Sequence, residues 1–396
     1  MSLNLSILSL KVKSFIQEHK KDNIPDLILK GSPFEDATIQ NIAQQIHGLR
    51  IAEQKFPTLL QNENIIYPPK INLEQSSSEI TASYKSKFIK ENDNILDVTG
   101  GMGIDCLAFS NIAKSVTYID IEENTCQYAK HNFEVLNKNI KAFNADGIEF
   151  LKQQNLKFDL IYLDPARRNK NKSKVYRLED CTPNVLEHLE FLKFRASRIL
   201  LKVSPLLDIN YCIETLPNVE SLHIVSVKNE VKELLISINF EINQENPVII
   251  ATNLKSSHHI FKAFYSDKDT LQDLSLPQKY IYEPNASLMK MGFFGEICKR
   301  FNLKALHANS HLFTSDEHIE FPGRTFNVLD IISPKKQLLR KIIKNNKANV
   351  ATRNYPLKPQ DVKKKYGLID GGSLFVFFTT NLKNDKIVLI CNKIID

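Results

Sequence analysis

Between residues 76 and 243, short apolar segments alternate with amphipathic segments of helical spacing. The apolar segments predict seven β-strands, at residues 94–98, 116–120, 140–145, 158–163, 198–203, 222–227 and 232–240. Strands separated by helices pair in parallel, because each crossover returns the chain to the same end of the sheet. Only a short charged turn around Asn229 and Glu230 separates the last two strands, so we expect an antiparallel hairpin there. The pattern predicts an α/β, Rossmann-like fold with a mostly parallel sheet.

The two flanks of this region have different patterns. Residues 1–75 show helical spacing at Ile39, Ile42, Ala43 and Ile46, which predicts a helical amino-terminal domain. Beyond residue 244 we expect a strand at 248–251 and a helix at 287–301. The end of the chain predicts a small α/β module, with strands at 326–332, 348–351, 374–379 and 387–391 and helices at 335–344 and 359–366. We therefore expect four domains, at 1–75, 76–243, 244–322 and 323–396.

The composition argues against several classes of protein. No segment approaches the roughly 20 apolar residues of a membrane span, and the first residues lack a signal-peptide pattern, so we expect a cytoplasmic protein without a membrane partner. Six scattered cysteines never form C-x-x-C, which argues against a zinc knuckle or a disulfide framework. His307 and His311 lie four residues apart, but no Glu or Cys completes a ligand set beside them. We expect no metal site, and the sequence does not indicate an oligomeric state.

Positive charge is concentrated near the carboxyl terminus. Residues 331–366 carry eleven Lys or Arg and one acid, so this segment has a net charge of +10 and the rest of the +7 chain a net charge of −3. A second cluster lies between residues 167 and 177, which contain no acid. Such clusters are typical of proteins that bind the phosphates of a polyanion, although a solvated surface has the same composition. The predicted RNA-contacting residues are Arg168, Lys335, Lys336, Arg340, Lys341 and Arg353.

The strongest motif is the glycine-rich turn between the first strand of the core and the helix that follows. The strand ends at Asp97, and the turn contains Thr99, Gly100, Gly101 and Gly103. Glycines let the backbone approach a ligand at the carboxyl edge of the sheet, where open α/β sheets bind ligands. A dinucleotide fingerprint would need a third glycine where the chain has Cys106, and a carboxylate before the glycines repels a phosphate. The same carboxylate suits the ammonium group of a methionine moiety.

Acidic residues also end the next two strands. Asp120 follows Asp97 by 23 positions and is suited to accept hydrogen bonds from both ribose hydroxyls. Asp146 ends the third strand, within reach of an adenine amino group. Each acid alone also fits a helix cap. Together with the glycine-rich turn, the three acids predict a site for S-adenosylmethionine.

An Asp-Pro pair follows the fourth strand, and we expect its carboxylate to be aimed over the cofactor. Asp164 can accept a hydrogen bond from an amino group, orient the nitrogen lone pair and help to remove a proton. The alternative is a helix-capping Asp-Pro pair. The predicted catalytic residues are Asp164, Pro165 and Arg167.

These motifs resemble those of class I, S-adenosylmethionine-dependent methyltransferases with a carboxyl-terminal THUMP-like domain. The resemblance rests on the turn at 97–105, Asp120, Asn144-Ala-Asp146, the segments 163–168 and 73–85, and Phe321-Pro-Gly-Arg324. It implies a seven-stranded sheet finished by an antiparallel hairpin, with a ferredoxin-like domain at 244–322 and a THUMP-like, RNA-binding domain at 323–396. It also implies S-adenosylmethionine as the methyl donor and a structured RNA, such as tRNA, as the partner.

The turn and the Asp-Pro pair are also similar to guanine-N2 methyltransferases that act on ribosomal RNA or RNA caps, which suggests an exocyclic amine as the acceptor. Those enzymes usually have an aromatic residue after Asp-Pro-Pro, whereas Ala166 and Arg167 follow here. Either Arg167 stacks on the base, or Tyr176 does, or the acceptor is not a base. The sequence therefore predicts methylation of tRNA or rRNA. The alternatives are a non-catalytic RNA-binding or assembly protein that keeps this fold, and a nicotinamide-dependent dehydrogenase.

Overall fold

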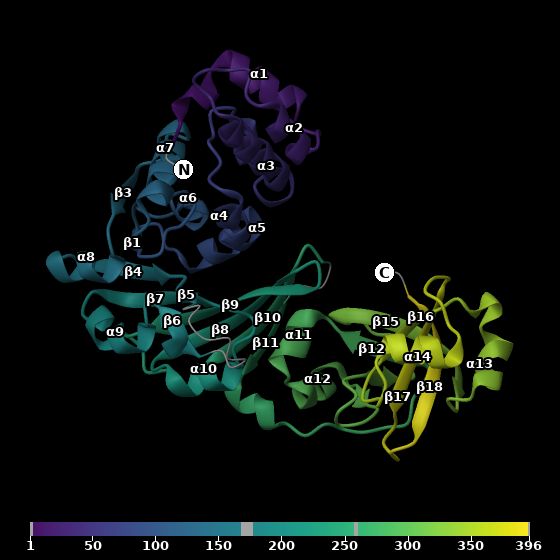
Figure 1. Ribbon diagram of the computed structural model, residues 1–396. Helices are drawn as coiled ribbons and strands as arrows, with labels where there is room; N and C mark the ends of the chain where they lie inside the picture. The colour runs from purple at the N-terminus through teal and green to yellow at the C-terminus, as the bar shows by residue number, and fades with distance from the viewer. Residues whose placement is uncertain (1–2, 168–176, 257–259, 395–396) are drawn as a thin grey trace. The chain divides into compact units, whose positions relative to one another are not determined.

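The computed structural model describes residues 3–167, 177–256 and 260–394 (Figure 1). The chain divides into two compact units. Unit 1 contains residues 1–219 and 235–243, and unit 2 contains residues 220–234 and 244–396. Within the described residues, every helix is too short or too polar to traverse a lipid bilayer.

Unit 1 is built on a sheet with the strand order β9-β7-β4-β1-β2-β3. The strands are β1 (Asn94–Asp97), β2 (Ser115–Asp120), β3 (Ile140–Asn144), β4 (Phe158–Leu163), β7 (Ala196–Val203) and residues 235–239 of β9 (Glu230–Asn239). The pairs β7-β4, β4-β1, β1-β2 and β2-β3 are all parallel, as the sequence predicted. The carboxyl ends of β1, β2, β4 and β7 therefore meet at one edge of the sheet, where a ligand site is expected.

The helices of unit 1 form a helical head and the crossovers of the sheet. The head contains α1 (Leu10–Glu18), α2 (Ile24–Lys30), α3 (Ile39–Lys55), α4 (Lys70–Gln75) and α5 (Glu79–Lys85). The other helices are α6 (Ile104–Phe109), α7 (Glu123–Val135), α8 (Gly147–Gln153), α9 (Val185–Lys193) and α10 (Ile209–Thr215). The head packs on α7, where Gln44 Nε2 donates to Tyr128 Oη at 3.0 Å. The side-chain amide of Asn132 accepts from the Ile66 N–H and donates to the Ile66 carbonyl.

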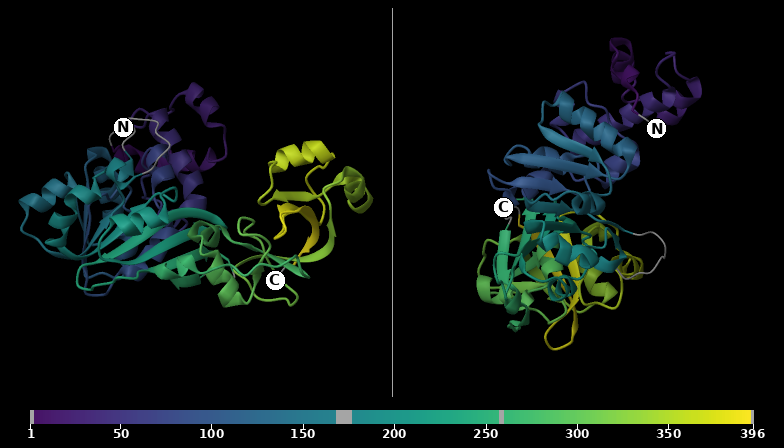
Figure 2. Two further views of the ribbon diagram at one scale, coloured as in Figure 1. Left: turned by 90° about the horizontal axis from the view of Figure 1, so that it is seen from below. Right: turned by 90° about the vertical axis from the view of Figure 1, so that its left-hand side faces the viewer.

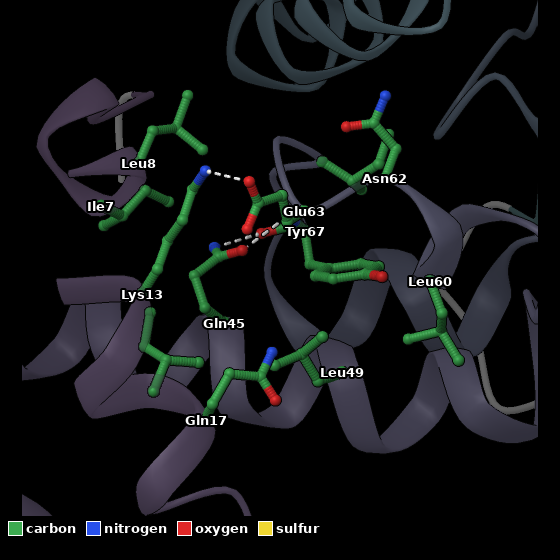
Figure 3. Close-up of a pocket in the computed structure, with 12 residues that line it drawn as sticks. Ile7, Leu8, Lys13, Gln17, Gln45, Leu49, Leu60, Asn62, Glu63 and Tyr67 are labelled. Atoms are coloured by element: carbon green, nitrogen blue, oxygen red, sulfur yellow. Dashed lines mark hydrogen bonds and ion pairs between the residues drawn. The ribbon is translucent and has the colours of Figure 1, made fainter. Parts of the chain in front are cut away.

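A hollow lies inside the helical head, between α1, α3 and the segment 60–67 (Figure 3). An ion pair between Lys13 and Glu63, 3.6 Å long, lies beside it, and Gln45 bonds the backbone of Tyr67. None of the candidate site residues lines this hollow.

Unit 2 begins with a second set of strands, in the order β11-β10-β8-β9. The strands β8 (Val219–Val227) and β9 meet at a two-residue turn, in which Lys228 and Asn229 have φ values of 50° and 65°. Positive φ at both positions matches the twist of a tight hairpin. The strand expected at 248–251 is β10 (Val248–Leu254), which pairs in parallel with β8, and β11 (Ile260–Phe264) pairs with β10 in antiparallel.

The second sheet of unit 2 carries helices α13 (Lys336–Ile342) and α14 (Pro359–Tyr366) (Figure 2). Its order is β13-β14-β12-β15-β18-β17-β16. The strands are β12 (Tyr280–Pro284), β13 (Lys304–Ala305), β14 (Phe313–Ser315), β15 (Gly323–Ile332), β16 (Asn349–Thr352), β17 (Leu374–Thr380) and β18 (Lys386–Lys393). Val376 and Phe378 of β17 pack with Leu339 of α13 and Val362 of α14, whereas Phe377 belongs to a separate core cluster. Alternate residues of β17 therefore face opposite sides, and both helices share one face.

Two expectations for unit 2 need correction. The single helix expected at 287–301 is two helices, α11 (Ala286–Met291) and α12 (Phe294–Phe301), because Gly292 adopts φ 78° and ends the first. Strands β11, β12, β13 and β14 had no expected counterpart in the sequence analysis. For β14, Leu312 and Phe313 alone form an apolar run too short to predict a strand. The fourfold division of the chain at 75, 243 and 322 stays a prediction.

Candidate active site

Asp97 lies at the start of the glycine-rich turn and accepts hydrogen bonds from it and from the helix that follows. Its side chain is almost fully buried, with the residue 1% exposed. The Oδ1 atom accepts a hydrogen bond from the Thr99 N–H at 3.0 Å, and Oδ2 accepts one from the Cys106 thiol at 3.2 Å. Burial raises the pKa of Asp97 from 3.8 to about 7. The sequence located Asp97 but missed Cys106 as its donor, because nothing in the spacing distinguishes this cysteine from a buried hydrophobe.

The glycines of the turn are required by conformation and by space. Gly101 and Gly103 have φ values of 53° and 78°, where side chains other than glycine are strained. A Cβ atom on Gly100 would lie 2.2 Å from the Tyr118 ring, and one on Gly103 would lie 2.5 Å from the Phe133 ring. Tyr118 also donates its hydroxyl to the Gly101 carbonyl at 2.7 Å. The backbone of the turn therefore packs directly against the rings of Tyr118 and Phe133, with no space for a side chain at Gly100 or Gly103.

We expect Gly103→Ala to destabilise the chain by about 2 to 5 kcal/mol, the sum of the cost of a left-handed alanine and the cost of an overpacked Phe133 contact. Gly292→Ala is the matched control, because Gly292 has the same φ of 78° but no neighbour within 4 Å of an added Cβ. This control should lose only about 1 to 2 kcal/mol. Hydrogen exchange of the peptides around each glycine gives both values, and equal losses would contradict the packing argument.

Asp120 joins the end of β2 to the turn. Its Oδ2 atom accepts from the Gly101 N–H at 2.7 Å and its Oδ1 atom from the Glu122 N–H at 2.8 Å. Ile121 follows with 66% of its surface exposed, a feature that the sequence pattern did not single out. Asp146 is exposed and caps α8, since its Oδ1 atom accepts from the N–H groups of the second and third helical residues. Asp146 is therefore a helix cap, which was the alternative interpretation of this residue, and a contact of Asp146 with adenine stays a prediction.

Asp164 lies at the end of β4, directly beside the turn. Its backbone N–H donates to Thr99 Oγ1 at 2.7 Å, and its Oδ2 atom forms an ion pair with Lys202 of β7. Pro165 follows it, half-buried. The backbone of Arg167 pairs with Cys181 in the small strands β5 (Ala166–Arg167) and β6 (Cys181–Thr182). The Arg167 side chain, Arg168 and Tyr176 lie outside the described residues.

A buried polar cluster ties the helical head to this edge of the sheet. Asp105, in the first turn of α6, accepts on Oδ2 from Ser77 at 2.7 Å and from the Tyr162 hydroxyl at 2.9 Å. Lys85 of α5 is fully buried, and its ammonium lies 3.3 Å from Asp105 Oδ1. A buried charge is stable only when it is paired, so the cluster fixes α5 against the helix that follows the turn.

The raised pKa of Asp97 predicts a pH dependence. Because the folded-state pKa, about 7, exceeds the ordinary 3.8, the protonated form favours folding, and this stability is lost as pH rises through 7. We expect the melting temperature of the ligand-free chain to fall between about pH 4 and about pH 7 more steeply than that of Asp97→Asn, which has no charge to bury. Thermal unfolding across this range measures the difference. Parallel curves for the two chains would show that Asp97 does not titrate there.

The basic residues between 331 and 366 are mostly exposed and, within the described residues, without ion-pair partners. Nine of the eleven Lys and Arg between 331 and 366 are exposed, and among the described residues none of these nine has an ion-pair partner. They are Lys335, Lys336, Arg340, Lys341, Lys344, Lys347, Lys358, Lys364 and Lys365, and we call them the basic face. Lys363 pairs with Asp370, and Arg353 pairs with the buried Glu283. Arg353 thus has an internal partner that the sequence did not reveal, and its contact with RNA stays a prediction.

His307 and His311 lie in the loop between β13 and β14, not on one helix. His307 exchanges hydrogen bonds with Asn354 and Asn384, and His311 stacks on Phe294 with ring centroids 4.2 Å apart. Within the described residues, no group of three or more His, Cys, Asp or Glu could hold a metal ion.

Three family models match segments of the chain. Residues 79–188 match the model described as conserved hypothetical protein 95, residues 280–322 match a ferredoxin-like domain, and residues 323–393 match a THUMP domain-like model. Among curated proteins, an uncharacterized RNA methyltransferase of Mycoplasma mobile is 29% identical over 154 residues, 37% of this chain and 42% of that protein. A tRNA (guanine(26)-N(2))-dimethyltransferase of Methanobrevibacter smithii is 30% identical over 120 residues, 29% of this chain and 31% of that protein. The chain thus spans less than half the length of these curated relatives.

Similarity to one solved structure covers almost the whole chain. The crystal structure of a protein from Porphyromonas gingivalis W83, assigned as a methyltransferase, has 31% sequence identity and a TM-score of 0.88, over 99% of this chain and 100% of that one. The chain belongs to the class I, S-adenosylmethionine-dependent methyltransferase family with ferredoxin-like and THUMP-like domains.

Proposed function

We propose that this chain transfers a methyl group from S-adenosylmethionine to RNA. The observation that carries the proposal is the bare glycine-rich turn among the ends of β1, β2 and β4, each of which is followed or closed by a carboxylate. Asp97 lies beneath the turn, Asp120 lies beside it, and Asp164 is hydrogen-bonded to it through Thr99.

The residues at this edge fit the chemistry of the methyl donor. Asp120 accepts one N–H on each oxygen, which leaves a second lone pair on each for a ribose hydroxyl. The exposed Ile121 offers an apolar surface for an adenine ring, and Asp146 offers an acceptor for its amino group. When ionised, Asp97 favours a cation, such as an ammonium or a sulfonium, over a diphosphate, and a bound cation would in turn favour its ionised form. Thr99, Gly100, Gly101 and Gly103 would hold the donor through backbone groups.

Methyl transfer to an amine needs alignment more than activation. The sulfonium of the donor supplies an electrophilic methyl group, so the protein must place a nitrogen lone pair in line with it. Asp164 Oδ1 accepts a hydrogen bond from the acceptor amine and orients that lone pair. As the new N–C bond forms and the S–C bond breaks, the amine loses one proton, which passes by way of Asp164 to solvent.

For the acceptor, we propose an exocyclic base amine of tRNA or rRNA, with guanine N2 as the leading candidate. The support is the activity for which the Methanobrevibacter smithii relative is named and the Asp-Pro pair at residues 164 and 165. The match covers only 31% of the length of that relative, so the acceptor of this chain is our proposal and is not carried over from the relative.

The basic face supports RNA as the partner. Nine exposed cations without ion-pair partners within the described residues are available for phosphates to neutralise, with release of counterions. We therefore propose that unit 2 binds the RNA backbone through this face, and that Arg353 contributes less because Glu283 already engages it.

Charge reversal on α13 should weaken RNA binding strongly. For Lys336→Glu/Arg340→Glu/Lys341→Glu we expect a loss of roughly 100-fold or more in RNA affinity at ~50 mM salt and a shallower salt dependence, because about three phosphate contacts are removed. Fluorescence anisotropy with labelled tRNA measures both quantities. The control reverses three exposed lysines of the helical head, Lys11, Lys21 and Lys30. Equal losses in both triple variants would mean that net charge, not the basic face, determines binding.

The function itself is tested with purified full-length chain, labelled S-adenosylmethionine and RNA from cells that lack this protein. We expect label in tRNA or rRNA, at a nucleotide then identified by mass spectrometry. Label in protein or small molecules, with none in RNA, would refute an RNA substrate. Binding of S-adenosylmethionine without transfer to any acceptor would favour the non-catalytic alternative, and tighter binding of NAD would favour the dehydrogenase.

A further inference from the structure

Lys202 lies at the same edge of the sheet as the candidate catalytic carboxylate. Strands β4 and β7 pair in parallel with Leu163 opposite Leu201, so Asp164 and Lys202 follow side by side. The Lys202 ammonium forms an ion pair with Asp164 Oδ2, and the Lys202 side chain is only 13% exposed. Burial of an ammonium at the end of a central strand is costly unless it is paired, so its presence here calls for an explanation.

Asp164 is held from both sides of β4. On the β1 side, its backbone N–H bonds Thr99 Oγ1, and the Thr99 N–H bonds Asp97 Oδ1. On the β7 side, Lys202 engages Oδ2. The contacts therefore run without a break from Asp97 through Thr99 and Asp164 to Lys202, across three neighbouring strands.

One oxygen of Asp164 remains available. Within the described residues, Oδ1 has no hydrogen-bond or ion-pair partner, and the Asp164 side chain is 36% exposed. The terminal torsion of an aspartate is soft, so a carboxylate without a second tether turns readily about its Cβ–Cγ bond. The ion pair at Oδ2 restricts that rotation and gives Oδ1 one direction.

We propose that Lys202 is a positioning residue for methyl transfer: it holds Asp164 Oδ2 so that Oδ1 alone receives the acceptor amine. This inference rests on the proposed function. Alignment of the acceptor accounts for most of the rate in such a reaction, and a displacement of ~1 Å in a reacting group costs on the order of 100-fold. Oδ1 then accepts one N–H of the acceptor amine, while the ion pair of Lys202 with Oδ2 restricts rotation of the carboxylate.

The simpler explanation is that the ion pair only ties two strand ends together. The same strand provides the matched control, because Arg198 of β7 forms a buried ion pair with Asp93, 2.6 Å long, four residues before Lys202. This pair lies near the opposite end of β7 and touches none of the candidate site residues. Removal of either cation should lower stability, but only removal of Lys202 should separate methyl transfer from donor binding.

The experiment compares Lys202→Met, Lys202→Arg and Arg198→Met with the wild-type full-length chain. Calorimetry gives the dissociation constants of S-adenosylmethionine and S-adenosylhomocysteine, thermal unfolding gives stability, and single-turnover transfer to unmodified RNA gives the rate. For Lys202→Met we expect a rate ~100-fold lower with donor affinity within ~3-fold, and for Lys202→Arg, which keeps the charge, recovery to within ~10-fold of wild type. Arg198→Met should retain a rate within ~3-fold when assayed below its melting temperature.

Three results would overturn the inference alone: a Lys202→Met rate close to wild type, an equal loss of rate in Arg198→Met, or a fall in donor affinity that matches the fall in rate. If Lys202→Met does not fold, Lys202→Gln takes its place, because glutamine is polar but uncharged and its side chain is shorter than that of lysine. For this variant we expect at least a 10-fold loss of rate. Failure of the wild-type chain to bind the donor or to methylate RNA would overturn the proposed function, and this inference with it.

Discussion

Asp164→Asn should lower the rate of methyl transfer by roughly 100- to 10,000-fold while the dissociation constant of S-adenosylmethionine changes little. Asparagine keeps the shape of the side chain and the backbone bond to Thr99 Oγ1, but its amide has one acceptor oxygen in place of two and cannot compensate Lys202. The oxygen that remains turns toward the Lys202 ammonium, so the acceptor amine meets the amide NH₂ instead. Single-turnover transfer and calorimetry measure the two quantities.

Asp159→Asn is the control for this prediction. Asp159 lies near the other end of β4, where its Oδ2 atom accepts hydrogen bonds from the backbone and side-chain N–H groups of Asn94. Its replacement should lower stability and leave the rate within about 3-fold of wild type. If Asp164→Asn and Asp159→Asn lose the same activity, Asp164 acts only through the stability of the strand.

Glu283→Gln should destabilise unit 2 by about 2 to 3 kcal/mol, because it leaves two arginines without their shared carboxylate. Glu283 is 3% exposed, accepts from Arg324 Nε at 2.7 Å on Oε2 and from Arg353 Nη2 at 2.5 Å on Oε1. The full cost of breaking a buried ion pair is about 3 to 5 kcal/mol, but both arginines reach solvent in part, which reduces it. The contacts join β12, in the segment that matches the ferredoxin-like model, to β15 and the end of β16, in the segment that matches the THUMP-like model.

Hydrogen exchange of peptides that cover β12 and β15 is the suitable measurement, because a chain of two units need not unfold in one step. The control is Asp370→Asn, which removes the partner of Lys363 in the same unit. Asp370 is largely exposed, so its loss should cost less than about 1 kcal/mol. Unchanged protection of β12 in Glu283→Gln would mean that the arginines find other partners.

The fold of unit 1 could be predicted because its signals are local. Apolar runs at 94–98 and 158–163 mark strands within a residue of β1 and β4, and the helical spacing around Ile42 marks α3. The helix expected at 359–366 coincides with α14, where Pro359 starts the helix and Gly367 ends it. Prolines and glycines act on their own backbone, so their effect can be read without knowledge of distant residues.

The errors arise where long-range contacts override local pattern. Gly292 lies inside a periodic segment, and only its left-handed conformation reveals that α11 and α12 are separate. Strand β14 has three residues, and it exists because β12 and β13 pair with it on either side. Pairing between strands far apart in the chain leaves no periodic mark on so short a segment.

The sequence by itself determined which chemical groups are available: a glycine-rich turn, acids at the ends of successive strands, and a carboxyl-terminal excess of lysine and arginine. These follow from residue chemistry and from spacing along one strand or helix. Only the tertiary structure decided their partners. The Cys106 thiol donates to Asp97, Lys202 forms an ion pair with Asp164, and Glu283 forms ion pairs with Arg324 and Arg353. A charged side chain interacts through space with whatever the fold brings within a few ångströms, and that neighbourhood depends on sheet order and register rather than on the residues beside it in the chain.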